Sequence, residues 1–292
     1  MDFFVQALTF IQPEARRLNT YPSYSPSDPS VLQAFQADGV VCLRGAIDSV
    51  WLERLEGAVS HACENPGPDH FKFGEPGQAG SFFGDVMLWQ RHKVFEEFAF
   101  QGPLADIAGT LMKSSSVTFY HDFLLVKSPE SNKATPWHQD QSYWCFEGNQ
   151  ALTIWSPLDP VSVANTLEFA KGSHLRSPVF EAVPFDKEST FDGTRDARLP
   201  VPDMDATRDE HTILSWELQP GDCLIFHCRT LHASTGNPLP HSRRVLSTCW
   251  AGDDVRIIDV KSDLAPPIKG DGLKPGDHLA CKTFPQVRPK VA

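Results

Sequence analysis

The chain lacks the features that mark several large classes of protein. None of its seven cysteines belongs to a Cys-x-x-Cys pair and their number is odd, so we expect free thiols rather than a disulfide framework or a zinc site. No apolar run reaches the roughly 18 residues of a membrane-spanning helix, which predicts no membrane span. The first residues have neither the basic start nor the long apolar region of a signal peptide, so we expect a cytoplasmic protein.

Runs of basic residues are also missing. The formal net charge is −11, and we expect neither a nucleic acid nor an anionic membrane as a partner. No repeat, low-complexity tract or linker divides the chain, and a hydrophobic content of 41% is enough for a large core. We therefore predict one domain over residues 1–292, with a helical N-terminal part (about 1–115), a barrel core (about 116–252) and a C-terminal tail (253–292).

The N-terminal part shows helical spacing of apolar residues and one short β-like run. Helix caps and apolar periodicity predict helices at residues 26–38, 48–59 and 103–112, and a strand at residues 40–45. The stretch 65–84 is rich in Gly and Pro, and predicts an excursion over the surface.

After residue 116 the pattern changes to short apolar runs separated by Pro, Gly, Asn and Asp. These runs predict strands at residues 117–127, 137–143, 151–155, 166–170, 211–214, 222–227 and 243–250. Many short strands are typical of a double-sheet jelly roll or a related barrel, so the predicted fold class is mainly β with flanking helices. Residues 176–210 form a long polar insertion, for which an active-site lid and a loop without function both remain open.

His138 and Asp140 stand two positions apart on one predicted strand. Side chains at this spacing point to the same face of an extended segment. One imidazole nitrogen and one carboxylate oxygen supply two thirds of a 2-His-1-carboxylate site, the ligand set of non-haem Fe(II) oxygenases. The His-x-Asp pattern is common, so this interpretation depends on a third ligand elsewhere in the chain.

Two histidines near the end of the predicted barrel are candidates for the third ligand. His227 ends the strand predicted for residues 222–227, and His232 begins the next one. Either could reach a metal. We favour His232, because the small residues Ala233 and Ser234 follow it and leave space for a cosubstrate.

Arg243 and Arg244 open the last predicted strand of the barrel. A strand that returns antiparallel from the region of His232 could bring one of them beside the metal site. A guanidinium suits a dicarboxylate cosubstrate, because its planar fork meets a carboxylate in two parallel charge-assisted hydrogen bonds.

Taken together, these residues resemble the phytanoyl-CoA dioxygenase family of Fe(II)/2-oxoglutarate-dependent oxygenases. The resemblance covers about residues 40–250. Its motifs, in order, are Lys127-Ser-Pro129, His138-Gln-Asp140, Trp155, Gly172-Ser-His174, Gly221-Asp222, His232 and Arg243.

The resemblance implies a double-stranded β-helix (jelly-roll, cupin-like) core with helices packed outside. It implies Fe(II) as the metal, 2-oxoglutarate and O2 as cosubstrates, and an enzyme that hydroxylates a small organic, lipid-like or secondary-metabolite substrate while releasing succinate and CO2. The implied iron ligands are His138, Asp140 and His232. The implied contacts to 2-oxoglutarate are Arg243, which binds the distal carboxylate, and Ser234, Trp155 and Phe123.

Alternative functions stay open at this point. Related iron halogenases have a small residue where this chain has Asp140, which favours hydroxylation, desaturation or ring closure over halogenation. A non-catalytic, cupin-like metal protein that binds or senses a ligand is the main alternative, and zinc hydrolysis would leave Arg243 unexplained. The substrate and the oligomeric state are not predicted. Candidate residues for an apolar pocket, or for ordinary core, are Phe82, Phe83, Trp89, Tyr143, Trp144 and Phe146.

Overall fold

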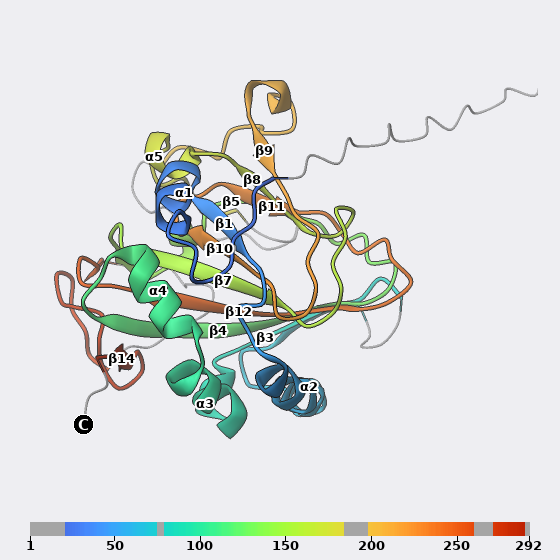
Figure 1. Cartoon of the computed structure of the whole chain (residues 1–292), viewed down its shortest axis with the longest axis horizontal. Helices are drawn as coiled ribbons and strands as arrows, with labels where there is room; N and C mark the ends of the chain where they lie inside the picture. The colour runs from blue at the N-terminus through green and yellow to red at the C-terminus, as the bar shows by residue number, and fades with distance from the viewer. Residues whose placement is uncertain (1–20, 75–78, 184–197, 260–270, 290–292) are drawn as a thin grey trace, which may run out of the picture.

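The computed structural model describes residues 21–74, 79–183, 198–259 and 271–289. Its largest element is an antiparallel sheet with the strand order β1-β10-β7-β12-β4-β3-β2, in which β14 also pairs with β4 (Figure 1). The strands of this sheet are β1 (Val40–Leu43), β2 (Phe71–Phe73), β3 (Phe82–Val86), β4 (Val117–Lys127), β7 (Ala151–Pro157), β10 (Cys223–His227), β12 (Arg243–Ala251) and β14 (Gln286–Arg288).

A smaller antiparallel sheet, with the order β5-β11-β8-β9, faces the larger one. It contains β5 (Thr135–His138), β8 (Leu167–Ala170), β9 (Ile213–Leu214) and β11 (His232–Ser234), while β6 (Phe146–Glu147) and β13 (Arg256–Ile257) pair separately. The helices are α1 (Val31–Asp38), α2 (Ser49–Glu64), α3 (Lys93–Gln101), α4 (Leu104–Met112) and α5 (Ser173–Arg176), with 3-10 turns η1 (Leu88–Gln90), η2 (Asp140–Tyr143) and η3 (Arg208–Glu210). The predicted fold class, mainly β with flanking helices around a jelly-roll core, is confirmed.

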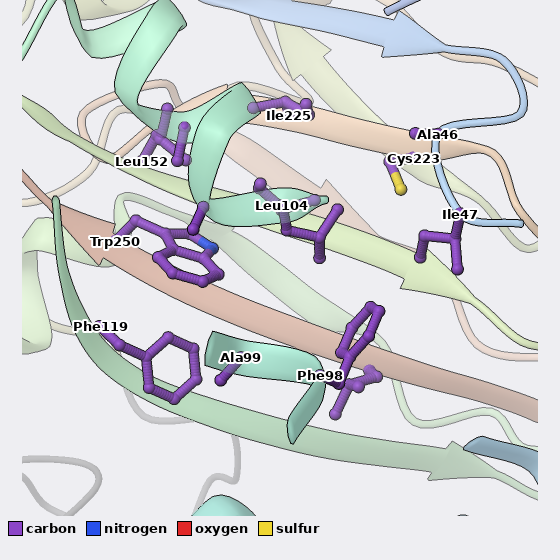
Figure 2. Packing of buried hydrophobic residues seen from close by; sticks show 14 of the residues in the cluster. Ala46, Ile47, Phe98, Ala99, Leu104, Phe119, Leu152, Cys223, Ile225 and Trp250 are labelled. Atoms are coloured by element: carbon purple, nitrogen blue, oxygen red, sulfur yellow. The ribbon is translucent and has the colours of Figure 1, made fainter. Parts of the chain in front are cut away.

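Alternate residues of the larger sheet enter two different cores, because successive side chains of a strand point to opposite faces. Leu152 and Ile225 lie on the outer face, where helices α1 to α4 pack. Figure 2 shows both residues together with Leu104 of α4. Trp155 and Leu224 point inward, toward residues of the smaller sheet such as Phe169. The larger sheet is therefore apolar on both faces, and polar side chains on its inner face need a specific reason.

The helices begin and end where local chemistry directs them. Asp48 caps α2 by accepting a hydrogen bond from the Trp51 amide at 2.9 Å. Gly39 ends α1 with a φ of 79°, and a Cβ there would lie 2.4 Å from Nδ1 of His174. Only glycine fits both the dihedral angle and the space. None of the helices in the described ranges combines the length and apolarity that a membrane crossing requires.

The predicted surface excursion over residues 65–84 is wrong. This stretch contains β2 and most of β3, a hairpin that extends the larger sheet beside β4, and every residue of β3 is buried. Gly84 belongs to the strand itself, because it is the register partner of Phe71 on β2. A Cβ there would lie 2.4 Å from the ring of Phe71. Glycine here permits close packing instead of marking a loop.

The strand predicted at residues 137–143 is also partly wrong. β5 ends at His138, and Asp140 opens the 3-10 turn η2. Gln139 nevertheless keeps extended dihedral angles (φ −118°, ψ 137°), so the alternation of side chains continues as far as Asp140. Helix α3 was not predicted, although Phe95, Phe98 and Ala99 form its buried face.

The polar insertion at residues 176–210 lies partly outside the described residues, at 184–197. Its described ends pack beside β5 and η2. Phe180 and Met204 join Trp137 of β5 in a small apolar cluster. The hydroxyl of Tyr143 donates to the Val183 carbonyl oxygen at 2.6 Å and accepts from the Val183 amide at 3.0 Å.

Candidate metal centre and anion site

Two imidazoles and one carboxylate converge between the two sheets. His138, Asp140 and His232 each offer one ligand atom, and these three atoms lie within 4.8 Å of one another. The antiparallel register of β5 and β11 places His138 opposite His232. Oδ1 of Asp140 lies 3.5 Å from Nε2 of His138 and 3.4 Å from Nε2 of His232. In the described part of the chain, no other group of three His, Cys, Asp or Glu side chains converges in this way.

Backbone carbonyls fix the orientation of both imidazoles. Nδ1 of His138 donates to the Pro136 carbonyl oxygen at 2.8 Å, and Nδ1 of His232 donates to the Thr230 carbonyl oxygen at 2.9 Å. With the proton on Nδ1, the lone pair of Nε2 points toward Asp140 and is available to a metal. Burial lowers the pKa of His138, which favours the neutral, metal-binding form of its ring.

Asp140 divides its two oxygens between the imidazoles and Thr153. Oδ2 accepts a hydrogen bond from Oγ1 of Thr153 at 2.5 Å, while Oδ1 faces the histidines. Burial raises the pKa of Asp140, but charge and hydrogen bonds from the two imidazoles, whenever these are protonated, outweigh it and hold that pKa well below its usual range. The carboxylate is therefore ionised and oriented. Thr153 was missed from the sequence, although it lies two positions before Trp155 on the same face of β7.

Gln139 points away from the three ligand atoms and anchors the segment that carries two of them. Its side-chain amide donates to the carbonyl oxygens of Pro178 at 3.1 Å and Arg229 at 2.9 Å. Its oxygen accepts from the Phe180 amide at 2.9 Å. The residue between the two ligands is thus fully hydrogen-bonded and has no exposed surface. This anchoring limits the positions that His138 and Asp140 can take.

His227, the alternative third ligand, is turned away from Asp140. Its Nε2 donates to the Asn149 carbonyl oxygen at 2.8 Å, and its Nδ1 accepts from the Arg229 amide at 3.1 Å. Both ring nitrogens are used, and the residue is absent from the convergent group. The preference for His232 agrees with this geometry.

Arg243 reaches from the larger sheet to the smaller one. Its Nη1 donates to Oγ of Ser234 at 3.2 Å and to the carbonyl oxygen of Asn165. Its Cζ lies 5.6 Å from the ring centroid of Trp155. Ser234 stands two residues after His232 on β11, which is about 6–7 Å along a strand. The guanidinium therefore sits near the three ligand atoms, at a distance that a short dicarboxylate can span.

Arg244 points to the opposite face of β12, as strand alternation requires. Its guanidinium forms ion pairs with Asp159 at 2.6 Å and with Glu56 at 2.5 Å. This arginine is thus occupied on the outer side of the sheet. Arg243 and Arg244 were both candidates for the arginine beside the metal site. Of these two, Arg243 lies in the interior beside β11.

Lys127 is a second buried cation at the same place. It is the direct partner of Arg243 in the β4–β12 ladder, and its exposed fraction is 1% against 2% for Arg243. Its Nζ donates to Oγ of Ser234 at 3.3 Å and to the Thr235 carbonyl oxygen at 3.0 Å. The sequence had presented Lys127 only as part of a motif.

Phe123 and Trp155 lie between the cations and Thr153. Both are register partners of Ser247, so they flank it on the inner face of the larger sheet. The structure thus groups all four predicted cosubstrate residues on one side of the interior. It does not group the six aromatic residues considered for an apolar pocket. Phe83 and Trp89 pack in the helix-side core, Tyr143, Trp144 and Phe146 share another cluster, and Phe82 lies under Nζ of Lys127.

Comparison with known proteins identifies relatives of the whole fold. The sequence profile of the phytanoyl-CoA dioxygenase (PhyH) family matches residues 35–245. A probable phytanoyl-CoA dioxygenase of Caenorhabditis elegans is 23% identical over 252 residues, which cover 78% of this chain and 76% of that protein.

Solved structures show the same fold at low sequence identity. The non-haem α-ketoglutarate-dependent carbocyclase SnoK, from nogalamycin biosynthesis, superposes with a TM-score of 0.71 at 19% identity, over 91% of this chain and 99% of SnoK. The epimerase SnoN, in complex with Fe3+, α-ketoglutarate and nogalamycin RO, gives a TM-score of 0.69 at 20% identity, over 89% of this chain and 100% of SnoN.

Proposed function

The chain belongs to the phytanoyl-CoA dioxygenase family, and we propose from this membership that it is a non-haem Fe(II)- and 2-oxoglutarate-dependent dioxygenase. One observation carries the proposal. The two ends of the short strand β11 face different groups. His232, at its start, belongs to the 2-His-1-carboxylate donor set, and Ser234, at its end, contacts the buried cationic pair. The donor set fits octahedral Fe(II) with open positions, and the cations fit the distal end of a dicarboxylate.

In this proposal His138, Asp140 and His232 hold Fe(II). Arg243 binds the distal carboxylate of 2-oxoglutarate, with Ser234 beside it and Trp155 and Phe123 along the cosubstrate. When bound, the metal and cosubstrate supply the oxidising chemistry, which releases succinate and CO2 and hydroxylates a small organic, lipid-like or secondary-metabolite substrate. Two observations indicate that the site fits Fe(II) and 2-oxoglutarate. Backbone carbonyl groups hold both imidazoles in a metal-binding orientation, and the buried Nε of Arg243 has no hydrogen-bond partner in the described ranges.

The protein's own contribution is orientation and the exclusion of water. The ligand residues are largely buried, so few solvent molecules compete for the metal positions. The Nδ1–carbonyl hydrogen bonds and the Thr153 hydroxyl hold the three ligand atoms in place before any metal arrives. Arg243 fixes one end of the cosubstrate, which leaves its keto-acid end to meet the metal.

The proposal extends to the organisation and setting of the chain. We treat residues 1–292 as one oxygenase domain, because β1 and β14, from opposite ends of the chain, both join the sheet that carries Arg243. A cytoplasmic location is supported by seven free cysteines, five of them buried. The partner is a small-molecule substrate and not a nucleic acid, given the net charge of −11.

Anaerobic addition of Fe(II) and 2-oxoglutarate is expected to produce a weak visible charge-transfer band. Exposure to air should then form succinate, which mass spectrometry detects. The absence of both signals would overturn the proposal. A band without any succinate would favour the non-catalytic metal protein instead. A screen of candidate substrates, scored by mass, separates hydroxylation, a gain of one oxygen, from desaturation or ring closure, a loss of two hydrogens.

Thr153→Val is expected to weaken Fe(II) binding by about 10–100-fold, the usual effect of removing a group that orients a ligand. Valine keeps the shape of threonine but leaves Oδ2 of Asp140 without its donor. The measurement is an anaerobic Fe(II) titration. Thr118→Val, at a buried position of β4 paired with Ala251, is the matched control and should bind as the wild type does. Equal affinities for all three proteins would show that Thr153 does not orient the ligand.

A further inference from the structure

Lys127 and Arg243 place two positive charges side by side in the interior. They are register partners on β4 and β12, and both direct a donor to the same oxygen, Oγ of Ser234. That oxygen in turn donates its own proton to the Thr235 carbonyl oxygen at 2.8 Å. One hydroxyl therefore accepts from two cations, which is an arrangement that like charges oppose unless an anion lies nearby.

No carboxylate of the described residues forms an ion pair with either cation. The surrounding acids are engaged elsewhere. Asp140 faces the histidines, Asp159 pairs with Arg244, and Glu168 pairs with Arg208 at 2.7 Å. Burial, together with the charge of Arg243, holds the pKa of Lys127 well below its usual range. Without a counter-ion Lys127 is driven toward its neutral form, whereas an anion held between the two groups would let both stay charged.

We propose that Lys127 is a second cationic ligand of the distal carboxylate of 2-oxoglutarate, which is held between Lys127 and Arg243. This inference rests on the proposed function. Both groups have donors to spare. The ammonium of Lys127 has three N–H bonds, of which two are used, by Ser234 and Thr235. Nε of Arg243 has no hydrogen-bond partner in the described part of the chain.

The surroundings of Lys127 hold its side chain in this position. The side-chain amide of Asn237 donates to the carbonyl oxygens of Lys127 at 3.2 Å and Ser128 at 3.1 Å, which fixes the end of β4. The ring centroid of Phe82, the partner of Lys127 on β3, lies 5.2 Å from Nζ. The ammonium therefore has an aromatic face on one side and β11 on the other, and cannot easily turn to solvent.

A carboxylate bound by two cations makes the site selective for dicarboxylic keto acids. 2-Oxobutyrate has the same keto-acid end as 2-oxoglutarate but no distal carboxylate. If Lys127 binds the distal carboxylate, its removal weakens the binding of 2-oxoglutarate and leaves the binding of 2-oxobutyrate nearly unchanged. Loss of a residue that only supports the fold would weaken the binding of both acids alike. The comparison of the two acids thus separates a binding role from a structural one.

The test is an anaerobic titration of the Fe(II)-loaded full chain with each acid, followed by the visible band or by tryptophan fluorescence. Lys127→Met is expected to raise the Kd of 2-oxoglutarate by about 10–100-fold, the range for a lost hydrogen bond to a charged group. The Kd of 2-oxobutyrate should change by less than about threefold. Lys133→Met is the matched control, because Lys133 is exposed and its Nζ lies over Phe73, at the edge of the same hairpin.

Each outcome decides between the possibilities. An unchanged Kd for 2-oxoglutarate in Lys127→Met, or an equal loss for both acids, overturns the inference and leaves the proposed function standing. A wild type that binds neither acid contradicts the proposed function instead.

Thermal melting supplies a second readout. Without cosubstrate Lys127→Met should melt no lower than the wild type, since a buried cation is removed, whereas saturating 2-oxoglutarate should stabilise the wild type more. A Lys127→Met protein that fails to fold would overturn the inference, because the lysine would then be needed for the fold itself.

Discussion

Replacing Asp140 with alanine is expected to abolish succinate formation and to weaken Fe(II) binding by more than about 100-fold. Groups that merely orient a metal ligand contribute about 10–100-fold to affinity, and loss of the ligand itself should exceed that. The variant also removes the negative charge that faces both His138 and His232, so the two imidazoles lose the group that balances a bound cation. An anaerobic metal titration and a succinate assay measure the two effects.

Asp122→Asn provides the control for this variant. Asp122 is a buried carboxyl on β4, and its Oδ2 accepts from the Trp89 amide at 2.9 Å, away from the histidines. Burial raises the pKa of Asp122 to about 7, so the amide replaces a group that is already partly neutral near neutral pH. This variant should keep its Fe(II) affinity and its activity. Retention of more than a tenth of wild-type Fe(II) affinity in Asp140→Ala would show that Asp140 is not a ligand.

Replacing Arg243 with methionine is expected to weaken 2-oxoglutarate binding by about 10–100-fold while Fe(II) affinity stays within a few-fold. The expected loss corresponds to the roughly 1.5–3 kcal/mol of a hydrogen bond to a charged group. Methionine fills much of the space beside Trp155 without supplying a donor. A titration of the Fe(II)-loaded protein with 2-oxoglutarate gives the affinity.

Arg244→Met is the natural partner of that experiment, since the two arginines are adjacent in sequence and opposite in direction. Arg244 forms its ion pairs with Asp159 and Glu56 on the outer side of the sheet, away from Ser234. The Arg244→Met variant should therefore bind 2-oxoglutarate as the wild type does. If the Arg244 variant lost affinity and the Arg243 variant did not, the assignment of the carboxylate ligand would be reversed.

The convergence of the three proposed metal ligands could be predicted because each position depends on local pattern. His138 and Asp140 follow from strand alternation, and that alternation continues through Gln139 although the strand ends. His232 was preferred over His227 because small residues follow it, and the β5–β11 register supports that choice. The residues alone left the choice between Arg243 and Arg244 open, because it depends on which face of β12 points inward, and only the family resemblance favoured Arg243.

The residues that were missed act through contacts between distant segments. Thr153 reaches Asp140 across the interior, and Lys127 meets Ser234 on the opposite sheet. Neither contact has a signature in sequence spacing, since each depends on how two sheets face each other. The hairpin of β2 and β3 was missed for a different reason. Its glycines were taken as turn signals, whereas Gly84 makes room for the ring of Phe71.

The position of β5 at the edge of the smaller sheet gives the metal a mechanical role. Two of the proposed ligands belong to the β5–η2 segment and the third to its neighbour β11, and 94 positions (232 − 138) separate the histidines along the chain. A bound ion would act as a reversible cross-link that closes this long loop. A permanent cross-link of similar span stabilises a fold by about 4–5 kcal/mol through the entropy of the unfolded chain. Binding of the metal would therefore hold the edge strand β5 to β11 and stabilise this side of the barrel, and removal of the metal by a chelator would reverse that stabilisation.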